Sequence, residues 1–308
     1  EAFSRPAVIV CNHQSMLDSF CMMFVAPKII MLANDHIKLN PIVGTIFRWS
    51  NFMTVGEGAS NIVARLRPLV EEGFSVAIFP EGERPDATDT DILRFRKGAF
   101  YIAKELGLDI VPVYFEGLLR IMPKGSALSN GGTLCIEVGE RISRQSLDSI
   151  GDTLAQAKEI RRRYRLELSR IYSNIYTPEG VRPIVIDRYI YKGSDVERQA
   201  RRALRAFVRQ ADLLRVPDGC DTMAVYDREG RGELALMLAL MYPGKKIICS
   251  LGIPENRELL RGCIEDFVRN VTVSEHIYDA DANSTPKFRV LAKGEDDDAP
   301  HSTDFITI

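Results

Sequence analysis

The stretch Ala7-Val8-Ile9-Val10-Cys11-Asn12-His13-Gln14-Ser15-Met16-Leu17-Asp18 decides how the first part of this 308-residue chain is expected to fold. Its first five residues are apolar without a break, which is typical of a buried strand. A polar segment follows at once and leads into a second apolar run. A buried strand, a polar loop and a helix in that order form the repeating unit of an α/β fold.

The same alternation of short apolar strands and amphipathic helices continues over the first half of the chain. We predict strands at 7–11, 29–33, 52–55, 75–79, 110–115 and 134–138. The clearest helices are predicted at 60–72 and 97–106, because apolar residues recur there at helical spacing. Gly73 and Gly107 directly follow these two helices, where a residue that ends a helix is expected. The first domain is therefore predicted to be α/β with a largely covered sheet.

A chain of 308 residues is long enough for two domains. An arginine-rich helix is predicted at 155–172, and we interpret Thr177-Pro178-Glu179-Gly180 as the break that follows it. A second arginine-rich helix is predicted at 195–212. After it come a strand at 222–226, a helix at 233–241, a strand at 246–250, a helix at 255–269 and a strand at 271–274. We therefore expect one domain at 1–176 and a second α/β domain at 181–308.

Both ends of the sequence lie close to strand patterns, at 7–10 and 304–308. We therefore expect the chain to be part of a longer protein. No apolar run reaches the roughly 18 to 20 residues that a membrane-spanning helix needs. The six cysteines are scattered and lack the close spacing of a zinc or redox motif, which favours a reducing, cytoplasm-facing compartment.

A hydrophobic content of 45% and a charged content of 27% exclude long disorder or a fibrous repeat. The net charge of −2 gives no reason to expect a nucleic-acid partner. The two arginine-rich helices either face anionic lipid headgroups or pair with acidic neighbours such as Glu159, Glu167 and Glu197, and we favour pairing. The apolar residues 22–25 belong either to a membrane-contacting face or to the core.

His13 and Asp18 are the first candidate site residues. A spacing of five would place them about 140° apart on a continuous helix, so His13 must precede the helix and Asp18 must lie in its first turns. Ser15 is then the expected N-cap. An aspartate on one imidazole nitrogen holds the tautomer in which the other nitrogen accepts a proton from a hydroxyl group. The alternative is a helix-capping aspartate beside an unrelated histidine.

A second polar segment, Pro80-Glu81-Gly82-Glu83-Arg84, follows the predicted strand at 75–79. The glycine allows close approach of a ligand to the backbone, and the guanidinium of Arg84 is suited to bind two oxygens of a phosphate or carboxylate. Arg94, Arg96 and Lys97 add positive charge at the start of the next helix, where free N–H groups also favour anions. The alternative is a solvated turn.

Three segments resemble blocks I, III and IV of the glycerolipid (lysophosphatidate) acyltransferase family. They are Asn12-His13-Gln14-Ser15-Met16-Leu17-Asp18, Phe79-Pro80-Glu81-Gly82-Glu83-Arg84 and Val111-Pro112-Val113-Tyr114-Phe115-Glu116-Gly117, and the resemblance covers roughly residues 1–150. It implies an acyltransferase-like α/β domain that moves an acyl group from acyl-CoA or acyl carrier protein to a lysolipid or glycerol phosphate. It also implies an enzyme at the cytoplasmic face of a membrane, either peripheral or as the soluble part of a larger membrane protein.

The family pattern assigns His13 as general base and Asp18 as its partner. It requires no metal or redox cofactor. The substrate-binding residues that it implies are Asn12, Ser15, Phe79, Pro80, Glu81, Gly82, Arg84, Lys97 and Pro112. The alternative is a non-catalytic lipid or acyl-carrier binding module appended to a larger membrane protein.

Two departures from the family pattern concern the acceptor. Block III usually has threonine where this chain has Glu83, and block II usually ends in an arginine where Phe52-Met53-Thr54-Val55 ends in valine. One positive charge is lost and one negative charge is gained. We therefore expect an acceptor that depends less on a phosphate, such as an amino-acid lipid.

Residues 222–233 resemble the first strand and glycine-rich turn of an S-adenosylmethionine-dependent methyltransferase, with Asp227, Gly230 and Gly232 as the implied cofactor-binding residues. The pattern lacks one glycine, and Ile247-Ile248-Cys249-Ser250 lacks the terminal acidic residue that would bind the ribose, for which Glu255 is a poor substitute. We expect a truncated, partial Rossmann domain that has lost cofactor binding or acts structurally.

Overall fold

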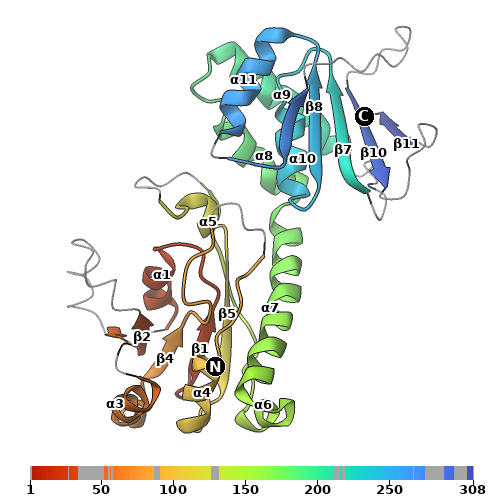
Figure 1. The fold of residues 1–308 in the computed structure, drawn as a ribbon. Coiled ribbons are helices and arrows are strands. Elements are labelled where there is room, and N and C mark those ends of the chain that lie inside the picture. Colours follow the sequence, from red (N-terminus) through yellow and green to blue (C-terminus); the bar gives the residue numbers. More distant parts are fainter. Residues whose placement is uncertain are drawn as a thin grey trace. The chain divides into compact units, whose positions relative to one another are not determined.

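The computed structural model describes residues 2–26, 28–33, 52–54, 56, 58–86, 91–125, 132–210, 216, 220–265, 267–274, 288–294 and 304–307. The chain divides into two compact units, Glu1–Ile171 and Tyr172–Ile308. Each unit contains its own sheet with helices packed against it (Figure 1). The α/β class predicted from the alternating pattern is confirmed for both.

The first unit is built on a six-stranded sheet in the order β3-β2-β4-β1-β5-β6. Strand β1 lies between β4 and β5, pairs in parallel with both, and is buried at every residue. Only β6 runs antiparallel to its neighbour. All six predicted strands are present: β1 (Val8–Cys11), β2 (Ile29–Ala33), β3 (Phe52–Thr54), β4 (Ser75–Ile78), β5 (Ile110–Glu116) and β6 (Cys135–Val138).

The helices predicted at 60–72, 97–106 and 155–172 are confirmed. Gly73 and Gly107 have φ angles of 95° and 66°, a backbone conformation that glycine adopts readily where a helix ends. The short helices α5 and α6 are not apparent from the sequence pattern. The helices of the first unit are α1 (Asp18–Val25), α3 (Ala59–Glu71), α4 (Gly98–Glu105), α5 (Leu118–Ile121), α6 (Arg144–Ile150) and α7 (Thr153–Ile175), the last of which continues into the second unit.

Helix α7 is attached to the centre of the sheet through Tyr164. The buried Tyr164 hydroxyl donates to the carbonyl oxygen of Val10 at 2.5 Å and accepts from the N–H of Val113 at 3.2 Å. One hydroxyl therefore joins α7 to both β1 and β5. Its contact on β1, the carbonyl of Val10, lies two residues before the polar loop that follows this strand. This contact positions the helix against the strand that leads into His13.

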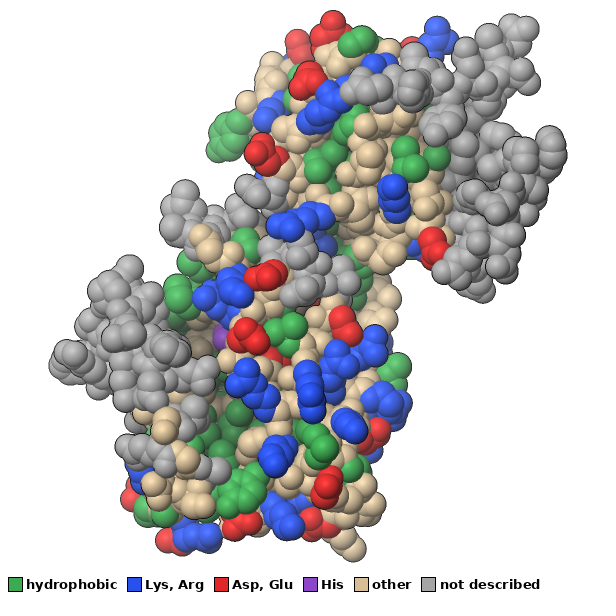
Figure 2. Space-filling view, in the orientation of Figure 1, with side chains coloured by type: hydrophobic (Ala, Val, Ile, Leu, Met, Phe, Trp, Pro, Cys, Tyr) green, Lys and Arg blue, Asp and Glu red, His purple; other side chains and the backbone are tan. Residues whose placement is uncertain are grey.

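The arginines of α7 pair with carboxylates. Arg162 and Arg163 both bond Glu159, and Arg170 bonds Glu167 and Glu137. Lys and Arg side chains gather on one face of the first unit (Figure 2). For α7, pairing with acidic neighbours is confirmed. On α9 (Ser194–Gln210) of the second unit, Arg201 pairs with Glu197.

The second unit has a five-stranded sheet in the order β11-β10-β7-β8-β9. Strands β7, β8 and β9 are parallel, whereas β10 and β11 run antiparallel to their neighbours. Its strands are β7 (Cys220–Asp227), β8 (Lys246–Leu251), β9 (Val271–Ser274), β10 (Phe288–Gly294) and β11 (Asp304–Thr307), and its remaining helices are α8 (Pro178–Asp187), α10 (Glu233–Met241) and α11 (Pro254–Ile264). The acidic segment 295–298 lies outside the described residues.

The break predicted at Thr177-Pro178-Glu179-Gly180 is shorter than expected: α7 ends at Ile175, Thr177 is not helical, and Pro178 already begins helix α8. Thr177 is the N-cap, and its hydroxyl accepts a hydrogen bond from the N–H of Gly180 at 3.2 Å. Pro178 occupies the first helical turn, where its missing N–H has no intrahelical partner to lose. The proline that suggested an interruption therefore starts a helix.

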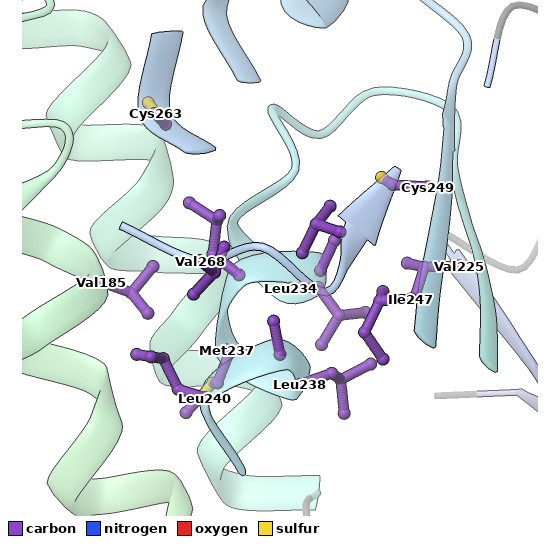
Figure 3. Packing of buried hydrophobic residues seen from close by; sticks show 14 of the residues in the cluster. Val185, Val225, Leu234, Met237, Leu238, Leu240, Ile247, Cys249, Cys263 and Val268 are labelled. Atoms are coloured by element: carbon purple, nitrogen blue, oxygen red, sulfur yellow. The ribbon is translucent and has the colours of Figure 1, made fainter. Parts of the chain in front are cut away.

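Helix α10 forms the centre of the second core. Every residue from Leu234 to Leu240 is buried, as expected for a helix that is apolar on all sides. In Figure 3 its side chains lie between Val185 of α8 and the strand residues Val225 and Ile247. The core of this unit therefore depends on covering α10 from both sides.

Within the described part of the chain, no helix has the length and apolar character to cross a bilayer. The same residues contain no group of His, Cys, Asp and Glu side chains placed to hold a metal ion. Cys11, Cys21, Cys135, Cys249 and Cys263 are free thiols.

Candidate active site

The candidate site lies where three neighbouring strands of the first sheet end. Strands β4, β1 and β5 are neighbours and run parallel, and polar residues lie at or shortly after the carboxyl end of each strand. Open α/β sheets bind ligands in the crevice at this edge. The structure brings the segments after β1 and β4 together here, although about seventy residues separate them in sequence.

His13 and Asp18 form a hydrogen-bonded pair. The distance from His13 Nδ1 to Asp18 Oδ2 is 2.7 Å, and the Asp18 side chain is fully buried whereas that of His13 is 19% exposed. Asp18 is the first residue of α1, and His13 lies in the loop before it. Ser15 is not the N-cap as predicted: Leu17 holds that position, and the Ser15 hydroxyl instead donates to the carbonyl of Met122.

Asp18 Oδ2 also accepts the backbone N–H groups of Gln14 and Ser15, at 2.6 and 2.8 Å. Burial raises the pKa of Asp18, and the hydrogen bonds from His13, Ser15 and Gln14 counteract that rise by favouring the ionised form. An ionised carboxylate only accepts hydrogen bonds, so the proton of this contact belongs to His13 Nδ1. The neutral imidazole then presents the lone pair of Nε2, which has no partner among the described residues.

The ring and backbone of His13 are held from two further directions. Phe79, the residue directly after β4, stacks on the imidazole with centroids 4.3 Å apart and planes at 19°. The side-chain amide of Asn12 exchanges two hydrogen bonds with the backbone of Phe115, at 2.8 and 2.9 Å. Asn12 thereby extends the pairing of β1 with β5 by one residue and places His13 at the sheet edge.

Glu81 connects the two polar segments. One carboxylate oxygen accepts the N–H of His13 at 2.7 Å, and the other accepts the N–H of Leu93 at 2.8 Å. The side chain is almost completely buried, and this burial raises the pKa of Glu81 from 4.5 to about 7. Glu81 therefore acts within the protein, as a bridge between the loop of His13 and the loop before α4.

Helix α7 fixes the second of these loops. Arg161 donates to the carbonyl oxygens of Ile92 and Leu93, at 2.6 and 2.9 Å, and its guanidinium also pairs with Asp91 at 3.1 Å. Arg165 bonds the same carboxylate. The loop before α4 is thus held at its backbone by Arg161 and at Leu93 by Glu81.

Gly82 is required at its position. Its φ angle is 76°, and an added side-chain carbon would lie 2.6 Å from the guanidinium carbon of Arg96. The carbonyl of the buried Pro80 accepts the N–H of Arg96 at 2.8 Å, which keeps the two loops in contact. Arg84 is half-buried in the segment after β4, and Lys97 is exposed at the N-cap of α4.

Five residues predicted to contact substrate are buried inside the protein: Asn12, Ser15, Pro80, Glu81 and Pro112. Ser15 is fully buried, and Pro112 lies within β5, opposite Val10 and packed close to Gly139. We infer a positioning role for Ser15 and Pro112. The sequence reasoning also missed Gln14, although it lies inside the first segment: its side-chain carbonyl accepts the N–H groups of Leu118 and Leu119 at the start of α5.

Comparison with known proteins identifies a family match that lies within the first unit. Residues 1–116 match the family model described as Acyltransferase. The first unit is acyltransferase-like. Human 1-acyl-sn-glycerol-3-phosphate acyltransferase beta is 33% identical over 150 residues, which cover 47% of this chain and 53% of the relative. A 1-acyl-sn-glycerol-3-phosphate acyltransferase of Chlamydomonas reinhardtii is 32% identical over 164 residues, covering 50% of this chain and 47% of the relative.

This chain therefore spans about half the length of these relatives. Among solved structures, the 1-acyl-sn-glycerophosphate (LPA) acyltransferase PlsC of Thermotoga maritima aligns at 25% identity with a TM-score of 0.44, covering 54% of this chain and 67% of that one. The resemblance read from the segments around His13, Glu81 and Pro112 is confirmed for residues 1–116.

The predicted cofactor residues of the second unit bond to one another. Asp227 accepts the N–H of Gly230 at 2.6 Å, and its carboxylate occupies the space above that glycine. Glu233 accepts the N–H of Arg231, and Gly232, at a φ of 83°, packs against Leu260. Burial, followed by the charge of Glu233, raises the pKa of Asp227 to about 7. The N–H donors of Gly230 and Arg231 in this turn are therefore already used.

The raised pKa of Glu81 predicts how stability depends on pH. Between pH 4.5 and 7 the folded state binds more protons at Glu81 than the unfolded state, so stability falls as the pH rises through this window. The loss between pH 4.5 and pH 8 is expected to be on the order of 3 kcal/mol. Urea unfolding followed by the fluorescence of Trp49, the only tryptophan in the sequence, measures it.

Glu81→Gln is expected to weaken this pH dependence by the contribution of Glu81, because the substituted side chain does not titrate. Glu105→Gln removes an exposed carboxylate on α4 and serves as the matched control, with the parent slope retained. An unchanged slope in Glu81→Gln would show that the titration lies elsewhere.

Proposed function

We propose that this protein transfers an acyl group from a thioester to the hydroxyl of a glycerol phosphate lipid, with His13 as general base. The observation that carries the proposal is the 2.7 Å contact between His13 Nδ1 and Asp18 Oδ2, which leaves Nε2 as a proton acceptor. The similarity of the first unit to named O-acyltransferases supplies the reaction class.

In the proposed reaction, the acceptor hydroxyl oxygen attacks the thioester carbonyl carbon while its proton moves to Nε2 of His13. The carbon–sulfur bond then breaks, and the leaving thiolate takes the proton from the imidazolium. Asp18 stabilises the imidazolium between the two steps. The products are the ester and the free thiol.

The protein needs no nucleophile of its own for this route. Cys11 is fully buried beneath the site, and burial raises the pKa of its thiol well above the usual range. Burial also raises the pKa of Cys21. Neither thiol is activated as a protein nucleophile.

The rival function, a non-catalytic lipid or acyl-carrier binding module, does not account for the dyad. A binding module has no use for a buried aspartate that orients an imidazole by one hydrogen bond and holds the same loop by two more. Keeping a carboxylate fully buried is costly unless it is matched by donors. The arrangement therefore favours catalysis.

For the acceptor, we propose a glycerol phosphate type with Arg84 as its anion ligand. The names of the relatives specify 1-acyl-sn-glycerol-3-phosphate. Glu83, which suggested a less phosphate-dependent acceptor, is 64% exposed and lies 3.9 Å from Arg96, so much of its charge is screened by solvent. Val55, the other departure, lies outside the described residues.

We place the reaction at a membrane surface, on the cytoplasmic side, because a lipid acceptor resides there. Phe24 on α1 is 91% exposed, which is unusual for an aromatic side chain and suits contact with lipid. It lies on the helix that begins with Asp18, one and a half turns further along. The acyl donor, acyl-CoA or acyl carrier protein, enters as a second substrate.

For the second unit, we propose a partial Rossmann domain, related to methyltransferases, without S-adenosylmethionine binding. The parallel strands β7, β8 and β9 with intervening helices support the fold, and the turn closed by Asp227 and Glu233 supports the loss of the ligand. The domain limits that we propose are 1–176 and 181–308.

Substitution of the dyad tests the catalytic proposal. His13→Ala is expected to lower kcat by about 10²- to 10⁴-fold, because proton transfer in the transition state is lost. Asp18→Asn should also lower kcat strongly, because the amide favours the wrong tautomer. Turnover of acyl-CoA with a panel of lysolipids measures both. Asp148→Asn, an exposed site on α6, is the control, and parent-like turnover in His13→Ala would end the assignment of the base.

The acceptor proposal predicts faster acylation of 1-acylglycerol-3-phosphate than of the matching monoacylglycerol, both presented in phosphatidylcholine vesicles that sediment with the protein. Arg84→Gln is expected to reduce this preference about tenfold or more, the effect of one charged contact to the phosphate. A parent enzyme that prefers the neutral or a zwitterionic lipid would contradict the phosphate assignment.

Calorimetric titration with S-adenosylmethionine tests the second unit. No saturable binding is expected, because the side chains of Asp227 and Glu233 take the N–H donors of the turn. Saturable binding to the parent chain would restore the cofactor site.

A further inference from the structure

Helix α9 of the second unit (Figure 1) carries a stripe of exposed arginines along one side. The stripe consists of Arg198, Arg201, Arg202, Arg205 and Arg209. By helical geometry, these side chains fall within an arc of about 100° and extend over about 17 Å of helix. On the other side of the helix, Ala200, Leu204 and Phe207 are buried in the core of the unit. Packing of that side therefore holds the arginines toward solvent.

Three arginines of this stripe have no acidic partner among the residues that the structure describes. They are Arg202, Arg205 and Arg209. The first two arginines of the stripe do pair, with Asp195 and Glu197 near the start of the helix. Uncompensated positive charge therefore accumulates along the last two turns of α9.

Helix α7 shows the opposite arrangement. Every arginine of α7 pairs with a carboxylate, and these arginines are Arg161, Arg162, Arg163, Arg165 and Arg170. Both helices are rich in arginine, yet α9 leaves part of this charge unpaired. Like charges four residues apart destabilise a helix, and Arg201, Arg205 and Arg209 have this spacing. An anionic surface outside the protein would offset their repulsion.

The exposed side of α9 favours a partner that is recognised by charge alone. Its other exposed residues are small or polar, namely Ser194, Asp195, Gln199 and Ala206. Protein partners are usually anchored by large side chains in pockets, and single-stranded nucleic acids by aromatic rings on which bases stack. The net charge of −2 gives no general attraction for nucleic acid either. A bilayer with anionic headgroups needs no such anchor and attracts arginines that lie close to its surface.

An exposed aromatic side chain next to α9 also suits a bilayer. Tyr191, in the turn before the helix, is 96% exposed, and the exposed Lys192 follows it. Tyrosine combines an apolar ring with a polar hydroxyl, which suits the level of the lipid headgroups. The stems of arginine side chains are apolar too, so they can lie on lipid while the guanidinium groups meet phosphates.

We propose that the arginine stripe of α9 binds the protein to a membrane surface that contains anionic lipids. The choice of a lipid surface rests on the proposed function of the first unit. The contact itself belongs to the second unit, so it is additional to the one proposed at Phe24. It makes membrane binding depend on the charge of the headgroups.

Sedimentation of the full chain with vesicles tests the stripe without requiring turnover. The parent is expected to bind vesicles of phosphatidylcholine and phosphatidylglycerol, mixed at about three to one, about tenfold or more tightly than vesicles of phosphatidylcholine alone. The triple variant Arg202→Gln/Arg205→Gln/Arg209→Gln should lose most of this preference, because the unpaired charges are removed. Raising the salt from about 0.1 M to about 1 M should remove the preference of the parent, since the screening length falls from roughly 10 Å to roughly 3 Å.

The matched control is Arg162→Gln/Arg163→Gln/Arg170→Gln on α7. It changes the net charge by the same amount, but the arginines that it removes are paired with carboxylates. It should keep the parent preference for anionic vesicles. Replacing the three unpaired stripe arginines by lysine should also keep most of the preference, because attraction to a charged surface does not require the guanidinium fork.

Three outcomes would overturn the proposal. The first is a parent-like preference for anionic vesicles in the triple glutamine variant. The second is an equal loss in the α7 control, because net charge and not the stripe would then decide binding. The third is binding of a short RNA or DNA through the stripe without any preference for anionic vesicles. Urea unfolding checks that the glutamine variant is folded, and its stability should equal or exceed that of the parent, because repulsion along α9 is relieved.

Acyl transfer by the parent distinguishes this inference from the proposed function. If the parent binds anionic vesicles through the stripe but acylates no lipid, the catalytic proposal fails and the stripe assignment stands. If the parent acylates a lipid acceptor while the triple glutamine variant keeps the full preference for anionic vesicles, the stripe assignment fails and the catalytic proposal stands.

Discussion

The buried carboxylate of Asp18 is the constraint on which the first unit depends. A single oxygen accepts hydrogen bonds from the His13 ring and from two consecutive backbone N–H groups, so it closes the loop between β1 and α1 and orients the imidazole at once. Removing a carboxylate from water is costly, and these donors offset the cost. Local folding and the proposed proton transfer therefore use the same atoms. A substitution that loosened the loop would also release the imidazole from its tautomer.

Glu81 extends this constraint to the rest of the site. By accepting N–H groups from both His13 and Leu93, it ties the loop after β1 to the loop before α4, and Arg161 holds the second loop from α7. Tyr164, one turn further along α7, bonds β1 itself. The helix thus contacts both the strand that leads into His13 and the loop that carries the basic side chains. In the proposed reaction, this double attachment would position two substrates against one imidazole without relying on a flexible surface loop.

The features predictable from the sequence were those encoded by neighbouring residues. Uninterrupted apolar runs located all six strands of the first unit, and the spacing from His13 to Asp18 identified the dyad. Contacts between distant segments were not accessible: Arg161 meets Ile92 across 69 positions, and Tyr164 meets Val10 across 154. Nothing in the local pattern around an arginine on a charged helix says whether it faces solvent or a carbonyl. Ser15 was misassigned for a related reason, because its partner, Met122, lies 107 positions away.

A glycine-rich turn after a strand can be open to a ligand or closed by neighbouring side chains, and the second unit has the closed form. A glycine-rich turn after a strand is a ligand site only if its N–H groups remain free, and here Asp227 and Glu233 accept them. The reason lies in α10, whose apolar residues are buried on every side and draw its N-terminus, with Glu233, into the interior. A carboxylate buried there needs donors, and the turn provides the nearest ones. The packing that stabilises the core of this unit therefore also closes the turn, so a ligand would have to displace buried carboxylates in order to enter.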